Sequence, residues 1–377
     1  GLLPSISLGG SWANRTLNPK SLGFTGESFP LPSLVGPFDV VDARAQFQQT
    51  LFDFSNLKRV SAAKSQVTAG VAEGSATVET SAQKVAIAYA RASPAQAVVS
   101  ARTADSALAA ELVKVAVAQQ QAGVSASIDV TRARVQLSES AGRLILASSQ
   151  LERAKIHLAR TLGIDPATPI ELADTLTETL GAADVPADRS AAVAKAIETR
   201  PDLAAELARG NAARTAASAI SAERLPRLAV AADYGLSGNQ AADAVTTRGL
   251  SVQLSWPILD GLRREGRQAE QQAVARQSDV RAKDLRQQVT ADVDGALLDL
   301  RSAAAQRMIS GERLRLAGEE VSQARQRFEA GVAGNIEVIN AQESLVRARE
   351  ADIDARFAGL LARISLARSV GSAHTLH

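Results

Sequence analysis

The sequence predicts a mostly helical protein that also carries four amphipathic strands and is built as a tandem duplication. Aromatic residues make up only 3% of the 377 residues while 46% are hydrophobic, which suits long helices packed through small side chains. Two runs of roughly 65 residues contain few helix breakers. Motifs in the first half of the chain recur 208 residues later, which indicates an internal repeat.

The repeat is clearest in two places. Residues 156–163 (IHLARTLG) recur as residues 364–371 (ISLARSVG), and the tripeptide Ala122–Val124 recurs as Ala330–Val332. Both matches share one offset, so coincidence is a poor explanation. Each unit therefore reads as strand, loop, strand, very long helix, glycine turn and returning helix.

These patterns predict the boundaries of the parts. Repeat 1 covers residues 1–163, an equatorial linker region covers 164–199, repeat 2 covers 200–371, and 372–377 form a tail. The predicted strands cover about 2–16, 39–53, 225–236 and 248–259, and the predicted helices cover about 55–121, 128–162, 197–224, 262–330 and 336–370. Since no helix equivalent to 197–224 precedes Pro4, we expect a further helix before Gly1 in the complete protein.

All four predicted strands alternate with a period of two. In the sharpest case, Leu250, Val252 and Leu254 alternate with Ser251 and Gln253. One face of each strand is apolar and the other is small or polar. The pattern fits strands between lipid and a wet lumen, and also a soluble sheet that covers a core.

Aromatic side chains favour the first of these two readings. Both tryptophans of the chain, Trp12 and Trp256, lie in the predicted strands, as do Phe47 and Tyr234. Amphipathic rings gather where a protein crosses the boundary of a bilayer. We therefore predict that these four residues form an aromatic girdle.

Four strands cannot close a barrel, and lipid tolerates no open sheet edge. Several copies of the chain must then share one barrel, and two, three or four copies give 8, 12 or 16 strands. Only the larger two leave a lumen wide enough to conduct solutes. The segments 18–37 and 238–247, which connect the strands, are rich in glycine, proline and polar residues and are expected to be exposed loops.

The long helices are expected to form a tunnel, because each spans roughly 100 Å at about 1.5 Å per residue. Asp53 and Asp260 stand where N-caps are expected. The returning helices follow Gly123 and Gly331, with Ser127 and Asn335 as matched candidate N-caps. Asp129 and Glu337 fall in the first turns, where a carboxylate also complements the helix dipole without any further role.

Composition argues against several classes of function. The chain has no cysteine, and its only histidines are His157, His374 and His377. Neither a phosphate-binding glycine loop nor a cluster of metal ligands appears, so we predict no enzyme, no cofactor and no metal. A net charge of +2, spread over long polar faces, does not indicate a nucleic-acid partner.

Three sequence strings resemble signatures of the TolC outer-membrane efflux family. They are Arg327–Gly331 followed by Ile336–Val338, then Arg200–Leu203, and Trp256–Gly261. Their order and spacing agree with the repeat, and together they cover nearly the whole chain.

The resemblance implies a homotrimer with a 12-stranded barrel in the outer membrane of a Gram-negative bacterium and an α-helical tunnel through the periplasm. It implies a periplasmic adaptor and an inner-membrane pump as partners. The expected function is that of a passive exit duct of a tripartite efflux pump or type I secretion system, gated at the periplasmic helix tips. A soluble periplasmic coiled-coil adaptor or scaffold is the alternative, and it would not need the four strands.

The resemblance also assigns residues. Gly123, Val124, Gly331 and Val332 are expected at the tips where the adaptor docks, with small side chains that allow close approach.

Asp129, Glu337 and Asn340 are expected at the periplasmic constriction, where three copies of Glu337 would favour cations. Relatives often carry a second acid where this chain has Asn340. In some relatives the first-turn acid bonds a Tyr and an Arg, and the matching positions here are Asp129, Phe328 and Ala333. We therefore expect a weaker acidic ring and no such lock.

Overall fold

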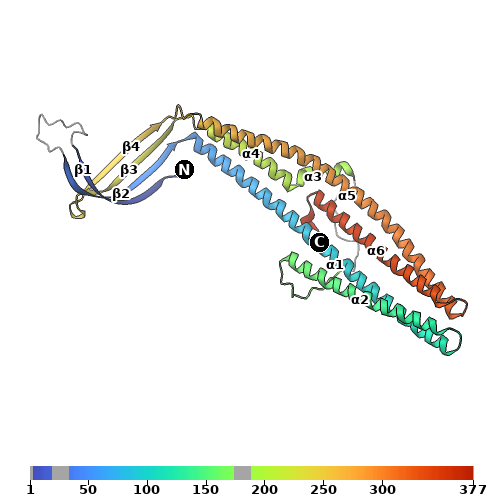
Figure 1. Cartoon of the computed structure of the whole chain (residues 1–377). Helices are drawn as coiled ribbons and strands as arrows, with labels where there is room; N and C mark the ends of the chain where they lie inside the picture. Colours follow the sequence, from blue (N-terminus) through green and yellow to red (C-terminus); the bar gives the residue numbers. More distant parts are fainter. Residues whose placement is uncertain (1–2, 19–33, 174–187, 377) are drawn as a thin grey trace, which may run out of the picture. The chain divides into compact units, whose positions relative to one another are not determined.

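The computed structural model describes residues 3–18, 34–173 and 188–376 (Figure 1). Its elements are, in chain order, β1 (Ser5–Leu17), β2 (Val35–Phe52), α1 (Phe54–Gln121), α2 (Ser127–Leu162), α3 (Arg189–Thr199), α4 (Pro201–Ala222), β3 (Arg227–Gly238), β4 (Val245–Ser255), α5 (Arg263–Glu329) and α6 (Asn335–Ser369). Short 3₁₀ turns, η2 (Ala241–Asp243) and η3 (Ala373–Thr375), follow β3 and α6. The predicted fold class, long helical hairpins with four strands in two repeats, is confirmed.

The chain packs as two compact units. Unit 1 contains residues 1–70 and 206–281, and unit 2 contains residues 71–205 and 282–377. Each unit combines segments of both sequence repeats. The long helices α1 and α5 each contribute one part to unit 1 and the other part to unit 2.

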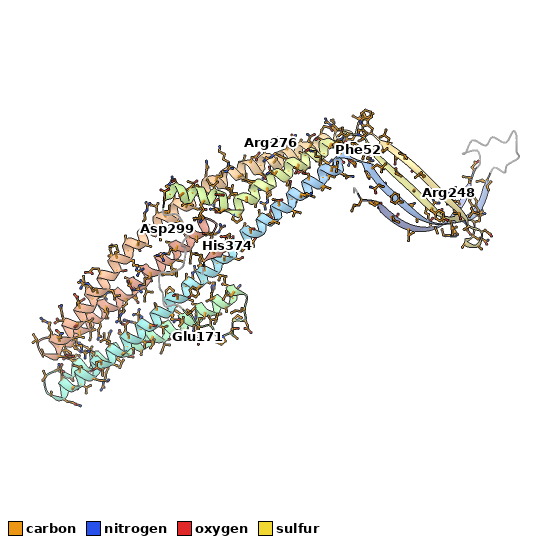
Figure 2. All side chains as sticks on the ribbon, turned by 180° about the vertical axis from the view of Figure 1, so that it is seen from behind. Phe52, Glu171, Arg248, Arg276, Asp299 and His374 are labelled. Carbon is orange, nitrogen blue, oxygen red and sulfur yellow. The ribbon has the colours of Figure 1, made fainter. Side chains whose placement is uncertain are left out.

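Unit 1 holds one antiparallel sheet in the order β1-β2-β3-β4. Its register aligns Leu8 with Ala45, Ala45 with Tyr234, and Tyr234 with Arg248. Figure 2 shows Arg248 and Phe52 near opposite ends of this sheet. Strands β1 and β4 each pair on one side only within the described residues, so both are edge strands.

The helical part of unit 1 is joined by ion pairs. Glu223 lies 2.6 Å from Arg59 of α1 and 2.5 Å from Arg267 of α5, and Arg214 of α4 lies 2.9 Å from Asp279 of α5. These pairs fix three helices just beyond the sheet.

Unit 2 contains α2, α6 and the parts of α1 and α5 that pair with them in the hairpins α1/α2 and α5/α6 (Figure 1). Their shared core is built from alanine and branched aliphatic residues with one phenylalanine: Leu112, Ala116, Val130, Ala133, Ala317, Val321, Ala324, Phe328, Val338, Ala341, Leu345 and Ala348. Such small side chains let four helices approach closely, as the low aromatic content predicts. Within the described ranges, no helix is both long enough and apolar enough to cross a bilayer.

Several predicted boundaries were wrong, and local chemistry explains two of them. The predicted helix 197–224 is instead two helices, because Arg200 adopts an extended conformation and Pro201 starts α4. Strand β4 ends at Ser255 instead of 259, since Pro257 cannot donate to a ladder.

Two further differences concern the connecting segments. Helix α3, which lies in the linker region, was not predicted. Residue Val35 pairs with Leu17, so β2 begins earlier than the predicted 39. The rest of the predicted loop between the first two strands, residues 19–33, lies outside the described residues, as do residues 174–187 of the linker.

Candidate functional site

The sheet has one apolar and one polar face, because partners in an antiparallel register share a side. The mostly apolar face carries Ile6, Leu8, Trp12, Val41, Phe47, Val230, Tyr234, Leu236, Leu250, Val252 and Leu254, together with Arg248 and the hydrogen-bonded pair Asn14 and Asp39. The polar face carries Ser5, Ser7, Ser11, Asp42, Arg44, Gln46, Gln48, Asp233, Ser251 and Gln253. Leu8 is 84% exposed and Leu250 is 76% exposed, so the described chain does not cover its own apolar face. A soluble sheet over a core would bury these side chains.

The four aromatic residues of the predicted girdle are exposed, but they do not lie at one height. Trp12 faces Val41 on the loop-proximal side of the sheet, and Tyr234 pairs with Arg248. Trp256 follows the last residue of β4, and its indole Nε1 donates to the backbone oxygen of Arg224 at 3.1 Å. Eight residues separate Arg248 from Trp256, about 26 Å along a strand.

Trp12 pairs with Val41, which pairs with Gly238, so this ring lies four residues from the level of Tyr234, about 13 Å along the strand. Phe47, opposite Ile6 and Ala232, lies two residues from Tyr234 on the other side. The four rings therefore lie at four levels of the sheet, and the aromatic girdle stays a prediction.

The two hairpin turns have the same backbone geometry. Gly123 has φ 75° and Gly331 has φ 70°, a left-handed conformation that favours glycine. The N–H of Val124 donates to the oxygen of Gln119 at 2.9 Å, and the N–H of Val332 donates to the oxygen of Arg327 at 3.0 Å. Each turn thereby closes its long helix with a Schellman-type bond.

The turns also lie close together. A Cβ built on Gly331 would lie 3.6 Å from Cγ1 of Val124, so the hairpin tips are neighbours. Val124 is 63% exposed and Val332 is 70% exposed. The four residues expected at the docking tips therefore form one exposed patch with small or branched side chains.

The predicted capping roles of Ser127 and Asn335 were wrong. The N-caps are Ala126 and Gly334, neither of which makes a side-chain cap bond, and Ser127 and Asn335 are the first helical residues. Asn335 is fully buried and donates from Nδ2 to the backbone oxygen of Asp129 at 2.7 Å. Its amide is used to join the two hairpins instead of capping its own helix.

The capping prediction holds at Asp53 and needs correction at Asp260. The Asp53 carboxylate accepts the backbone N–H groups of Ser55 at 2.9 Å and Asn56 at 3.2 Å, which is an N-cap. Asp260 precedes the first residue of α5 by three positions and accepts Nε of Arg264 at 3.1 Å.

The candidate gate acids are both paired with arginine. Glu337 lies 2.9 Å from Nε of Arg327 across the second turn, and Asp129 lies 3.9 Å from Arg132 on its own helix. Asn340 is exposed and contributes no charge. The structure thus places Asp129 and Glu337 near the same end of the hairpins, but each has a cation beside it.

A second side-chain bond also joins the hairpins. Gln119 of α1 donates from Nε2 to the backbone oxygen of Phe328 in α5 at 2.8 Å. Phe328 is 2% exposed and packs in the shared core. Gln119 thus joins α1 to α5, and Asn335 joins α6 to α2.

Sequence reasoning missed the partners of these residues. The 208-residue offset pairs Arg327 with Gln119 and Asn340 with Arg132, so the arginine stands on a different helix in each repeat. A side-by-side comparison of the repeats could have revealed this exchange, whereas the burial of Asn335 needed the structure.

The family model described as "Outer membrane efflux protein" matches residues 1–164 and 192–372, most of the chain. No curated protein matches the sequence significantly.

Solved structures share the fold at low sequence identity. The outer-membrane channel OprN is 17% identical over 98% of this chain and 82% of its own, with a TM-score of 0.77. The outer membrane protein VceC of Vibrio cholerae is 19% identical over 98% and 87%, with a TM-score of 0.78. The outer-membrane channel MtrE of Neisseria gonorrhoeae, in its open state, is 17% identical over 99% and 81%, with a TM-score of 0.79.

Proposed function

The chain belongs to the outer membrane efflux protein family, and from this premise we propose that it is the exit duct of a tripartite efflux pump or a type I secretion system. The observation that carries the proposal is the two-faced sheet, whose outer strands β1 and β4 have no further strand beside them in the described part of the chain. An exposed apolar face needs lipid, and unpaired edges in lipid need further strands. Neighbouring copies of the same chain supply them.

Three copies would give a 12-stranded barrel with the polar face toward the lumen. Two copies would give a barrel of eight strands, whose interior is just wide enough for side chains. A conduit for solutes needs the wider barrel. The fold shared with OprN, VceC and MtrE supports this arrangement.

The helical hairpins continue the duct into the periplasm in this proposal. Helices α1 and α5 have 68 and 67 residues, so each spans roughly 100 Å. Three copies of the two hairpins would enclose a tunnel whose narrow end lies at the turns. Asp129, Glu337 and Asn340 would border that constriction.

The exposed tips are the proposed docking surface for a periplasmic adaptor that connects the duct to an inner-membrane pump. Gly123 and Gly331 leave room for a helical hairpin to approach, and Val124 and Val332 supply exposed apolar contacts. The duct itself is passive, so the pump supplies the energy and most of the selectivity.

Detergent dependence and channel activity test the proposal together. The complete protein, purified from outer membranes, should form a trimer in detergent and aggregate without it. Reconstituted into a planar bilayer, it should conduct ions. A monodisperse, non-conducting protein in buffer alone would instead support the soluble adaptor or scaffold.

A further inference from the structure

The polar face of the sheet carries a fixed charge network near its middle. Arg44 of β2 donates from Nε to Oδ1 of Asp42 at 2.6 Å, and a second guanidinium nitrogen contacts the other oxygen of the same carboxylate. Nη1 of Arg44 lies 3.4 Å from Oδ2 of Asp233 on β3. One guanidinium therefore serves two carboxylates on adjacent strands.

Two glycines make room for this network. Gly235 pairs with Arg44, and a Cβ at Gly235 would lie 2.4 Å from Cβ of Arg44. Gly249 pairs with Asp233, and a Cβ there would lie 2.5 Å from Oδ1 of Asp233. The side chains of Arg44 and Asp233 thus lie against Gly235 and Gly249, in space that the side chain of any other residue at these two positions would fill.

The rest of this face carries little charge. Between Arg15 at the loop-proximal end and Arg227 at the helix-proximal end, its other described side chains are small, apolar or uncharged polar, such as Ser7, Gln46 and Gln253. The three groups Asp42, Arg44 and Asp233 are therefore the dominant charges of the middle part.

We propose that Arg44 determines the ion selectivity of the barrel lumen by offsetting one of the two negative charges of Asp42 and Asp233 and by holding both carboxylates against the wall. The inference rests on the proposed function, since the polar face must line a shared lumen. Three copies then form a belt of alternating charge. Such a belt keeps one net negative charge per chain, so it favours small cations only weakly, which suits a conduit for chemically varied cargo.

Removal of the arginine should reveal the carboxylates. In Arg44→Gln, two unneutralised acids per chain face the lumen, six in a trimer. The potassium-to-chloride permeability ratio, measured from reversal potentials in a salt gradient, should rise on the order of fivefold, the effect of one unit charge at about 4 Å in water. Block by a trivalent cation added on the side of the strand loops should appear. Asp233→Asn should shift the ratio the opposite way.

Two controls separate electrostatics from structure. Arg227→Gln removes the same charge from the same face but leaves the Asp42–Arg44–Asp233 network intact. It should therefore change the permeability ratio less than Arg44→Gln does. The triple variant Asp42→Asn, Arg44→Gln, Asp233→Asn should have about the same ratio as Asp233→Asn, because the network has no net charge in either protein. Wild-type selectivity in a conducting Arg44→Gln channel would overturn the inference.

If the Arg44→Gln protein fails to assemble, Asp233→Asn takes its place in the test. An unchanged permeability ratio in Asp233→Asn would likewise overturn the inference. The absence of any conductance in the wild-type protein would count against the proposed function and not against this network.

Discussion

Nε of Arg327 lies 2.9 Å from Oε1 of Glu337, so the acid expected at the constriction is joined to the helix on the other side of its turn. In the first repeat, Asp129 instead has Arg132 on its own helix at 3.9 Å. The two repeats thus neutralise matched acids from different directions. In the second repeat the pair links α5 to α6.

This pair gives the first prediction. Both side chains are about half exposed, so Arg327→Gln should change the free energy of unfolding by less than about 1 kcal/mol. It should nevertheless leave Glu337 unneutralised and increase block of single channels by cations added on the periplasmic side. Glu337→Gln should weaken that block.

The measurement is single-channel conductance with titrated divalent cation. Unchanged conductance and unchanged block in both variants would show that Glu337 takes no part in the gate. If the channel opens by a rotation of the hairpin α5/α6 about its turn at Gly331, Glu337→Gln should also change the open probability.

The second prediction concerns the buried amide of Asn335. Its Nδ2 donates to the oxygen of Asp129, and its Oδ1 has no hydrogen-bond partner among the described residues. Asn335→Ala should lower the free energy of unfolding by about 1 kcal/mol, because the hydrogen bond from its Nδ2 to the backbone oxygen of Asp129 is lost. Amide hydrogen exchange should accelerate at the tips of both hairpins.

Ser127→Ala is the matched control, since Ser127 occupies the equivalent position of the first repeat and is exposed. Equal exchange rates in both variants would show that Asn335 does not join the hairpins.

The third prediction concerns acid stability. Arg200, with a side chain 5% exposed, bonds Asp202 and Asp292, each at 2.7 Å. Burial alone would raise the pKa of Asp202, but hydrogen bonds and charge from Arg200 bring this pKa below its usual value. A depressed folded-state pKa means that the contribution is present above about pH 4 and is lost as pH falls further.

Urea unfolding between pH 7 and pH 3 checks this point. The wild type should lose stability below about pH 4, and Asp202→Asn should show a smaller loss over the same range. Arg200→Met should lower the free energy of unfolding by about 1–3 kcal/mol at pH 7, because the partly exposed carboxylates of Asp202 and Asp292 lose their charge-assisted hydrogen bonds. Identical pH profiles for wild type and Asp202→Asn would contradict the assignment.

The fourth prediction addresses the tips. Val124→Glu and Val332→Glu place charge on exposed residues and should leave trimer formation and bilayer conductance intact. Both should reduce crosslinking to the co-purifying periplasmic adaptor and lower efflux in cells. If a variant that carries both substitutions still crosslinks to the adaptor, the docking surface lies elsewhere.

The sequence predicted the architecture well because its signals are periodic. Alternation of Leu250, Val252 and Leu254 with polar residues depends on the strand period alone, and the repeated Gly turns mark positive φ at Gly123 and Gly331. Local chemistry also identified the N-cap at Asp53. These features need no knowledge of distant contacts.

The errors in the candidate site arose where distant contacts decide, unlike the boundary errors at Pro201 and Pro257. Asn335 has the residue type of an N-cap, yet its amide bonds the other hairpin. Arg327 and Glu337 lie ten residues apart on two different helices. The spacing rules for side chains on a single helix therefore do not predict that they pair. Arg44 lies within the predicted strand 39–53, but its bond to Asp233 depends on strand register.

Cysteine crosslinking between edge strands tests the central claim most directly, and the chain has no native cysteine to interfere. Leu8→Cys on β1 would be combined in turn with a cysteine at each position from Arg248 to Leu254 on β4. Within one chain two strands separate β1 from β4, so these thiols belong to different copies when they meet. The account predicts disulfide-linked trimers in detergent, strongest at one register and its alternate neighbours. Protein that stays monomeric at every position, or that crosslinks only within one chain, would contradict it.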